Sequence, residues 1–107
     1  MNGWIGVDLD GTLALYDGWK GVDDIGAPIP LMLDRVRAWL AEGMDVRIFT
    51  ARACFPDGIP PILAWLDANG LPPLPITNVK DTYMVELWDD RAVQVETNTG
   101  VPVKERP

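Results

Sequence analysis

Short apolar runs alternate with helical periodicity along this chain. The runs at residues 4–7, 44–49 and 84–88 predict strands. Apolar side chains recur three and four residues apart over residues 29–40, which predicts an amphipathic helix, and a second, shorter helical pattern covers residues 62–66. Strand and helix therefore alternate, which is typical of an α/β domain with a mainly parallel sheet.

Glycine and proline mark the expected ends of these elements. Pro30 and Pro60 suit the first turns of the two helices, and Gly43 and Gly70 suit their ends. Residues 13–27 are rich in Gly and Asp and show no clean period, so we expect a loop or small β-flap there. We call this segment the flap.

The second half of the chain carries further predictions. Residues 51–58 are expected to form a loop, 74–78 a third, short strand and 92–95 a final edge strand. The polar segment 96–107 is expected to be a loosely held tail, which leaves a single domain over residues 1–95.

Composition narrows the chemistry. The chain has 107 residues, a net charge of −7 and no histidine. The acidity argues against general nucleic-acid binding, and the absence of histidine excludes Ser-His and Cys-His nucleophiles and His-ligated zinc. Cys54 is alone, which rules out an intrachain disulfide. No signal-like or membrane-spanning run is present, so we expect a cytoplasmic protein without a membrane partner.

Polar residues follow the predicted strands. Asp8 and Asp10 come after the first strand, Thr50 after the second, Lys80 soon after the short third and Asp89 after the fourth. The carboxyl ends of parallel strands form one edge of a sheet, where ligands bind, so these residues are expected to converge. Two carboxylates ~4 Å apart repel by about 4 kcal/mol at an effective dielectric of 20, which predicts a cation or a shared proton between Asp8 and Asp10.

Four motifs in this order resemble those of the haloacid dehalogenase superfamily of phosphotransferases, in its smallest, capless form. Residues 7–12 (VDLDGT) match the first motif, 49–52 (FTAR) the second, Lys80 the third and 87–91 (LWDDR) the fourth. The resemblance covers residues 4–95. It implies a three-layer Rossmann-like fold, with a mainly parallel sheet flanked by helices and no cap domain.

The resemblance implies roles for the catalytic residues. Asp8 would be the nucleophile that forms an aspartyl phosphate, and Asp10 would be the general acid and then the general base. Thr50 would hydrogen-bond the phosphoryl group, and Lys80 would place positive charge against it.

It also implies a magnesium site. Mg²⁺ would be held by Asp8, the backbone carbonyl of Asp10 and Asp89. Asp90 would bind a metal-bound water or orient its neighbours. The function implied is a Mg²⁺-dependent phosphatase, that is, a phosphomonoester hydrolase.

The substrate would be a small phosphorylated molecule. The matched motifs assign its binding to Gly11, Thr12, Ala51 and Arg52, and Gly11 lets the backbone approach the phosphate. For Arg52, a plain surface charge is the alternative. Arg91 is interpreted as a surface partner of an acidic neighbour. The Asp-Asp-Arg ending resembles small nucleotidase-like members, which favours a nucleotide slightly.

The chain departs from fuller family members in two ways. It has no room for a cap, so the mouth is open unless the flap, or another subunit of a homo-oligomer, covers it. For Trp19 in the flap, packing onto the body is favoured over stacking on a leaving group. A parallel crossover usually needs a dozen or more residues, yet Lys80 and Met84 are almost adjacent, so the third strand is very short or the crossing irregular.

Two other functions compete with a phosphatase. Phosphate-receiver domains also combine an acidic pair, a phosphorylated Asp, a Thr and a Lys around Mg²⁺, but in those domains the acidic pair comes first and the Lys last. A binding-only module is disfavoured because no motif residue is missing.

Overall fold

The predicted pattern corresponds to a chain of short elements. The computed structural model describes residues 3–104. In chain order the elements are β1 (Trp4–Val7), α1 (Pro30–Ala41), β2 (Asp45–Phe49), the 3-10 helix η1 (Ala51–Cys54), α2 (Ile59–Ala68), β3 (Ile76–Thr77) and β4 (Met84–Trp88). The first, second and fourth predicted strands and both predicted helices are confirmed. The third strand is shorter than predicted, and the predicted loop over 51–58 contains η1.

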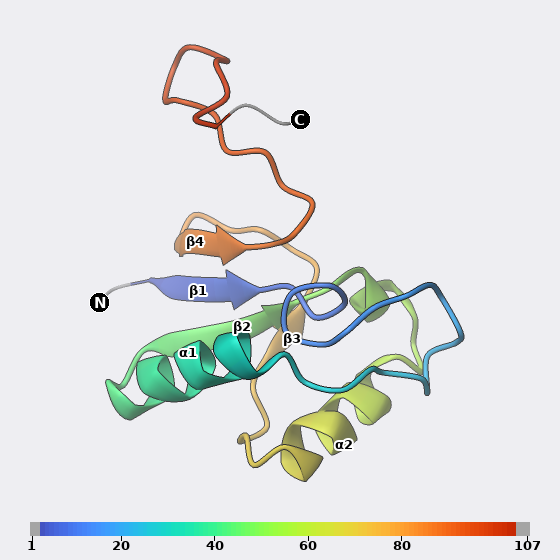
Figure 1. Ribbon diagram of the computed structural model, residues 1–107. Helices are drawn as coiled ribbons and strands as arrows, with labels where there is room; N and C mark the ends of the chain where they lie inside the picture. Colours follow the sequence, from blue (N-terminus) through green and yellow to red (C-terminus); the bar gives the residue numbers. More distant parts are fainter. Residues whose placement is uncertain (1–2, 105–107) are drawn as a thin grey trace.

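All four strands are parallel, in the order β3-β2-β1-β4 (Figure 1). The predicted α/β class with a mainly parallel sheet is thereby confirmed. β1 lies between β2 and β4, so the residues that follow these three strands leave the sheet side by side at its carboxyl edge. The topology alone therefore brings three of the four sequence motifs to one place.

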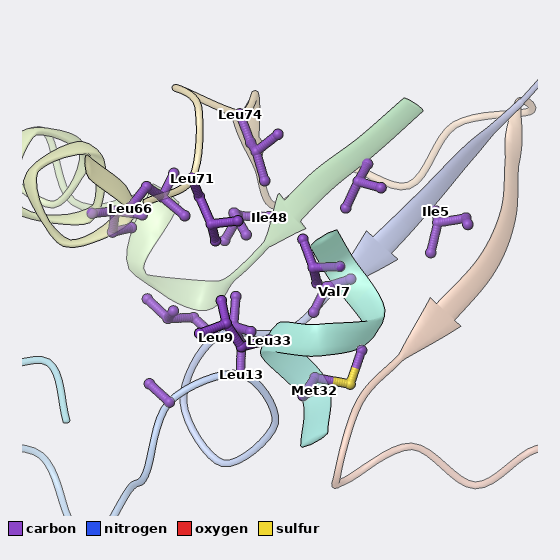
Figure 2. Close-up of a cluster of buried hydrophobic side chains, with 14 residues drawn as sticks. Ile5, Val7, Leu9, Leu13, Met32, Leu33, Ile48, Leu66, Leu71 and Leu74 are labelled. Carbon is purple, nitrogen blue, oxygen red and sulfur yellow. The ribbon is translucent and has the colours of Figure 1, made fainter. Parts of the chain in front are cut away.

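The hydrophobic core lies on one face of this sheet (Figure 2). Ile5 and Val7 of β1 are in register with Val46 and Ile48 of β2, so their side chains point to the same face. Both α-helices pack on that face, through Met32, Leu33 and Val36 of α1 and through Ile62 and Leu66 of α2. The second helical layer of the expected three-layer arrangement is not seen within residues 3–104.

The opposite face is built around Trp4. Its side chain is 1% exposed, its Nε1 donates a hydrogen bond to Asp81 Oδ1 at 2.8 Å, and the Arg47 guanidinium lies 4.7 Å from its ring centroid. Gly6 leaves space for this ring and for Met84, because a Cβ there would lie 3.2 Å from Trp4 Cζ3 and 2.6 Å from Met84 Cε. This face is thus covered by aromatic, aliphatic and loop residues where a helix would otherwise lie.

The connection between β3 and β4 is an extended crossover of six residues, 78–83 (Figure 1). It runs between the two edge strands, and Trp4 N donates to Tyr83 O at 2.9 Å where it meets β1. Three strand spacings are about 14 Å and a five-residue strand is about 13 Å long, whereas seven extended steps reach roughly 23–25 Å. Because the strands are short, the crossover needs no helix. This explains how a parallel connection can be made although Lys80 and Met84 are almost adjacent.

The predicted edge strand over residues 92–95 is wrong. After β4 the Arg91 N–H donates to Asp89 Oδ1 at 2.7 Å, an Asx-type turn that takes the chain off the sheet. Residues 95–102 then form a small exposed turn closed by an isolated bridge. Residues 105–107 of the predicted tail lie outside the described part. Within residues 3–104, no helix is both long and apolar enough to cross a bilayer.

Candidate functional site

Three strand ends converge as predicted. Asp8 N donates to Trp88 O at 2.9 Å where β1 meets β4, and Thr50 N donates to Thr77 O at 2.9 Å where β2 meets β3. The side chains of Asp8, Thr50 and Asp89 border one hollow at this edge. The sheet thus brings these residues together across gaps of about 40 positions in the sequence.

Three carboxylates form an acidic triad: Asp8, Asp89 and Asp90 each offer an oxygen within 4.8 Å of the others. Among residues 3–104, no Lys or Arg forms an ion pair with any of them. Thr12 lies between two of these residues. Its Oγ1 is 3.5 Å from Asp8 Oδ2 and 3.3 Å from Asp90 Oδ1, and it accepts from Asp90 N at 3.0 Å.

Gly11 allows Asp90 to close over the turn after β1. Its φ is +90°, a conformation that L side chains rarely adopt, and a Cβ there would lie 2.5 Å from Asp90 Oδ2. Gly11 and Thr12 therefore position the triad, which is a different contribution from the substrate contact assigned to them from sequence.

Electrostatics in the triad are unfavourable for an ionised Asp8. Partial burial, repulsion from Asp89, and then hydrogen bonding to and repulsion from Asp90 raise its pKa from 3.8 to about 7. A shared proton or a cation would relieve this repulsion. The sequence predicts such a group between Asp8 and Asp10, but the carboxylates that repel Asp8 are those of Asp89 and Asp90.

We expect the stabilising effect of Asp8→Asn to grow with pH when divalent cations are chelated. The folded-state pKa of Asp8 is raised, so its contribution to stability is fully present below 3.8 and is lost as the pH rises through about 7. Because Asp8 is partly solvated, the discounted effect on the free energy of unfolding is ~1–2 kcal/mol at pH 8 and about a third of that at pH 5.

Urea denaturation in EDTA at pH 5 and pH 8 measures this difference. Asp34→Asn, on the exposed side of α1, is the matched control and should show no such trend. An equal effect of Asp8→Asn at both pH values would contradict the electrostatic description.

Thr50 is ready to donate a hydrogen bond. It is 2% exposed, and its Oγ1 accepts from Arg52 N at 3.1 Å at the start of η1. A hydroxyl has one proton and two lone pairs, so this contact orients the oxygen and leaves the proton for another acceptor. Ala51 borders the same hollow as Asp8 and Thr50.

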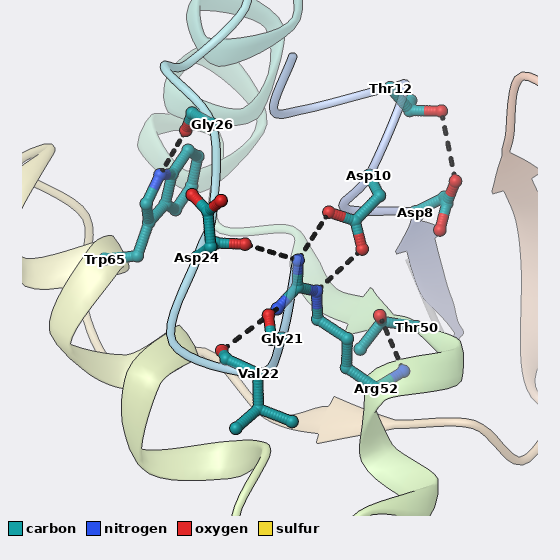
Figure 3. A network of polar contacts seen from close by, with 10 residues as sticks. All are labelled: Asp8, Asp10, Thr12, Gly21, Val22, Asp24, Gly26, Thr50, Arg52 and Trp65. Atoms are coloured by element: carbon teal, nitrogen blue, oxygen red, sulfur yellow. Dashed lines mark hydrogen bonds and ion pairs between the residues drawn. The ribbon is translucent and has the colours of Figure 1, made fainter. Parts of the chain in front are cut away.

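Asp10 is held apart from the triad by Arg52 (Figure 3). Arg52 Nε donates to Asp10 Oδ2 at 2.7 Å, and Nη2 donates to Asp10 Oδ1 at 3.0 Å. Figure 3 shows the Asp8 carboxylate turned towards Thr12 and the Asp10 carboxylate turned towards Arg52. Arg52 is 3% exposed, so its interpretation as a surface charge is wrong.

The flap borders the site, and an aromatic side chain of the flap packs against the body there. Trp19 stacks on Phe55, with ring centroids 5.6 Å apart, and lies 4.8 Å from the Arg52 guanidinium. These contacts favour packing onto the body over stacking on a leaving group. Between the flap and the strand ends lies a hollow of about 390 Å³, bordered among others by Asp8, Asp10, Tyr16 and Arg91.

Two basic residues differ from their sequence-based interpretation. Lys80 is exposed, lies on the crossover and borders another hollow along β4, which Asp89 also borders but Asp8 does not. Within residues 3–104 it forms no ion pair, so the structure does not bring it into contact with Asp8. Arg91 also forms no ion pair there and instead borders both hollows that contain Asp8. The position of Arg91 directly after the Asp89-Asp90 pair was the sequence signal that could have placed it at the site.

The triad has the chemistry of a divalent-cation site. Carboxylate oxygens are the ligands that Mg²⁺ prefers, and an octahedral ion with bonds of about 2.1 Å separates its ligand oxygens by roughly 3.0–4.2 Å. The observed 4.8 Å limit lies just above this range. Asp8, Asp89 and Asp90 are thus able to hold a divalent cation, whereas both oxygens of Asp10 already accept from Arg52.

The comparisons with known proteins bear on the fold. No protein-family model and no curated protein matches the chain. A solved structure, a conserved protein from Bacteroides thetaiotaomicron, is similar to this chain with a TM-score of 0.68 over 87% of this chain and 79% of that chain. At 20% sequence identity this likeness shows a shared fold and says nothing of activity.

Proposed function

We propose that this chain is a Mg²⁺-dependent phosphomonoesterase that works through an aspartyl phosphate on Asp8, in a capless domain of the haloacid dehalogenase type. The acidic triad carries the proposal, because three carboxylates without a protein cation lie at the strand edge beside a buried, donating Thr50. Unpaired carboxylates at this spacing are costly unless a cation neutralises them.

The residues divide the chemistry between them. An Asp8 oxygen attacks phosphorus while the bond from phosphorus to the leaving oxygen breaks, and Asp10 gives its proton to that oxygen. Asp10 then takes a proton from water, whose oxygen attacks the same phosphorus and restores Asp8. Thr50 donates to a phosphoryl oxygen throughout. Mg²⁺, when bound, would keep Asp8 ionised and neutralise the phosphoryl oxygens.

The hollow beside Asp8 is of a size that suits a small substrate. Its volume of about 390 Å³ falls in the range of small-molecule pockets, about 300–1,000 Å³. Tyr16 and Phe55 border it and Arg91 supplies positive charge, which supports a phosphomonoester with a ring in its leaving group, such as a nucleotide.

A phosphate-receiver module is the second candidate, and the Asp10–Arg52 pair favours it. A carboxylate whose two oxygens both accept from Arg52 has only its outer lone pairs free for proton transfer, so it would take a proton from water more slowly and a phosphorylated Asp8 would persist. Steady-state release of phosphate separates the two functions. With p-nitrophenyl phosphate and Mg²⁺, a phosphatase turns over many times, whereas a receiver is labelled once and then stops.

The experiment that tests the proposal is a screen of phosphate release over nucleotides, sugar phosphates and phosphorylated nucleic-acid ends, with and without Mg²⁺. Multiple turnovers on at least one class, dependent on the cation, support a phosphatase. Single labelling of Asp8 without turnover supports the receiver.

The two basic residues near the site give a separate prediction. The resemblance implies that Lys80 places positive charge against the phosphoryl group. If Lys80 turns towards Asp8 to do so when phosphate binds, Lys80→Met should lower kcat by roughly 10²-fold through loss of transition-state charge. Arg91→Met should mainly raise KM, because Arg91 already borders the hollow.

Steady-state kinetics of both variants check this split, with Lys20→Met as a control for a cation on the flap. A Lys80→Met enzyme with wild-type kcat would assign the positive charge of the site to Arg91.

A further inference from the structure

Arg52 uses every N–H of its guanidinium group. Two N–H groups bind the two oxygens of Asp10. The others reach the flap, where Nη1 donates to Val22 O at 3.0 Å and Gly21 O at 3.4 Å, and Nη2 donates to Asp24 O at 2.8 Å (Figure 3). One buried side chain therefore joins the carboxylate of Asp10 to three backbone carbonyls of the flap.

The flap tip, residues 16–25, depends on this side chain. Within residues 3–104, every hydrogen bond between the flap tip and the rest of the chain comes from Arg52. The base of the flap is fixed separately, by Leu15 N to Ala27 O at 2.8 Å and by Trp65 Nε1 to Gly26 O at 2.8 Å. Loss of Arg52 would therefore remove these hydrogen bonds, leave the tip held only by packing such as that of Trp19 on Phe55, and keep the base in place.

Trp19 covers the Arg52 guanidinium and its hydrogen bonds on the side that faces solvent. Its ring lies 4.8 Å from the Arg52 guanidinium, while Arg52 itself is 3% exposed. A guanidinium shielded in this way holds its partners more tightly than one in water, because competing water is excluded. Opening of the flap would remove both the carbonyls and the cover, and so would hydrate Arg52.

We propose that Arg52 is a positioning residue that couples the flap to Asp10, so that the carboxyl group of Asp10 is held in its working place only while the flap tip is closed. This inference rests on the proposed function. Each Asp10 oxygen keeps a second lone pair, so the carboxyl group can carry its proton on the side away from the guanidinium. The flap would then act as the cover that a capless site otherwise lacks.

The leaving group reveals whether Asp10 is in place. A p-nitrophenolate leaves without a proton, whereas an alkoxide needs one from Asp10 as the bond from phosphorus breaks. Disturbance of Asp10 alone therefore lowers kcat/KM, which covers the steps up to departure of the leaving group, for alkyl phosphates such as glycerol phosphate and largely spares kcat/KM for p-nitrophenyl phosphate. The later attack of water, in which Asp10 is the base, is common to both substrates and does not enter kcat/KM. General damage to the fold would slow both equally.

The test compares Arg52→Lys with Arg47→Lys. Arg47 is a close match, since it also makes a two-point contact with a carboxylate, Asp45, and lies over a tryptophan, but on the opposite face of the sheet. Lysine keeps the charge but lacks the planar fork that joins Asp10 to the carbonyls. Circular dichroism and urea denaturation establish that each variant folds.

For Arg52→Lys we expect kcat/KM on glycerol phosphate to fall about 10²-fold and kcat/KM on p-nitrophenyl phosphate less than about 5-fold. Tryptic cleavage after Lys20 in the flap tip should become at least about 10-fold faster, whatever substrate is used. Arg47→Lys should change neither kcat/KM on the two substrates nor the rate of cleavage after Lys20. If Arg52→Lys does not fold, Trp19→Ala, which removes an exposed side chain, should show both effects in weaker form.

Equal losses of kcat/KM on the two substrates, or cleavage after Lys20 at the wild-type rate, would overturn the coupling while leaving the phosphatase proposal intact. Absence of turnover by the wild type on every substrate would overturn the proposed function and this inference with it. Asp10→Asn separates the placement of Asp10 from the closure of the flap tip. It should show the leaving-group effect, while cleavage after Lys20 stays slow.

Discussion

Replacement of Asp8 by asparagine is expected to lower phosphate turnover by at least about 10⁴-fold, as removal of a covalent nucleophile does in other enzymes. An amide oxygen is a weak nucleophile at phosphorus and cannot form the acyl phosphate. The triad makes the change structurally mild, because Asp8 repels Asp89 and Asp90 and is held at an elevated pKa of about 7. The variant should therefore be inactive and no less stable than the wild type.

Three measurements test this. Steady-state phosphate release gives the loss of turnover, and mass spectrometry after rapid acid quench shows whether a phosphoryl group sits on Asp8 in the wild type. Urea denaturation confirms that the variant is folded. Asp34→Asn on α1 is the matched control and should keep wild-type turnover. Turnover by Asp8→Asn within 10-fold of the wild type, a margin of about 1.4 kcal/mol, would remove Asp8 from its role.

The convergence at the strand edge was predictable because it follows from topology. Parallel strands share one carboxyl edge, so alternation of strand and helix was enough to bring Asp8, Thr50 and Asp89 together. The apolar runs that carried this argument are continuous and bounded by turn residues, which is why three strands and both helices were found. The edge strand over 92–95 failed because a local Asx-type turn at Asp89 outweighs the apolar residues that follow it.

The role of Arg52 could not be read from the sequence, because it depends on where the flap folds. An arginine after a strand is ordinarily solvated, and nothing in its neighbours predicts burial. Burial of the Arg52 guanidinium depends on three carbonyls that accept its hydrogen bonds, and these come only from the return of residues 21–24 over η1. Similarly, Lys80 was placed by motif order alone, whereas its position depends on the path of an extended crossover that sequence patterns do not encode.

Chelation of divalent cations is expected to lower turnover by at least about 10³-fold and to lower the melting temperature, because both effects have one physical cause. The triad holds three carboxylates without a protein cation, so a bound ion removes their repulsion and supplies charge opposite the phosphoryl oxygens. At a cation concentration of 100 times the dissociation constant, binding to the folded state alone adds about 2.7 kcal/mol.

A single substitution separates this explanation from general ionic effects. In Asp89→Asn, removal of one charge from the triad should raise the dissociation constant for Mg²⁺ about 10–100-fold, yet should stabilise the protein in EDTA by ~1 kcal/mol. Weaker Mg²⁺ binding together with higher stability in EDTA is expected only where the lost carboxylate both repels its neighbours and holds the ion. Calorimetric titration with Mg²⁺, and thermal denaturation with and without EDTA, measure the two quantities. Full turnover after exhaustive chelation, or a Mg²⁺ affinity that Asp89→Asn leaves unchanged, would show that the triad does not hold the catalytic cation, because no other described cluster of carboxylates lies within reach of Asp8.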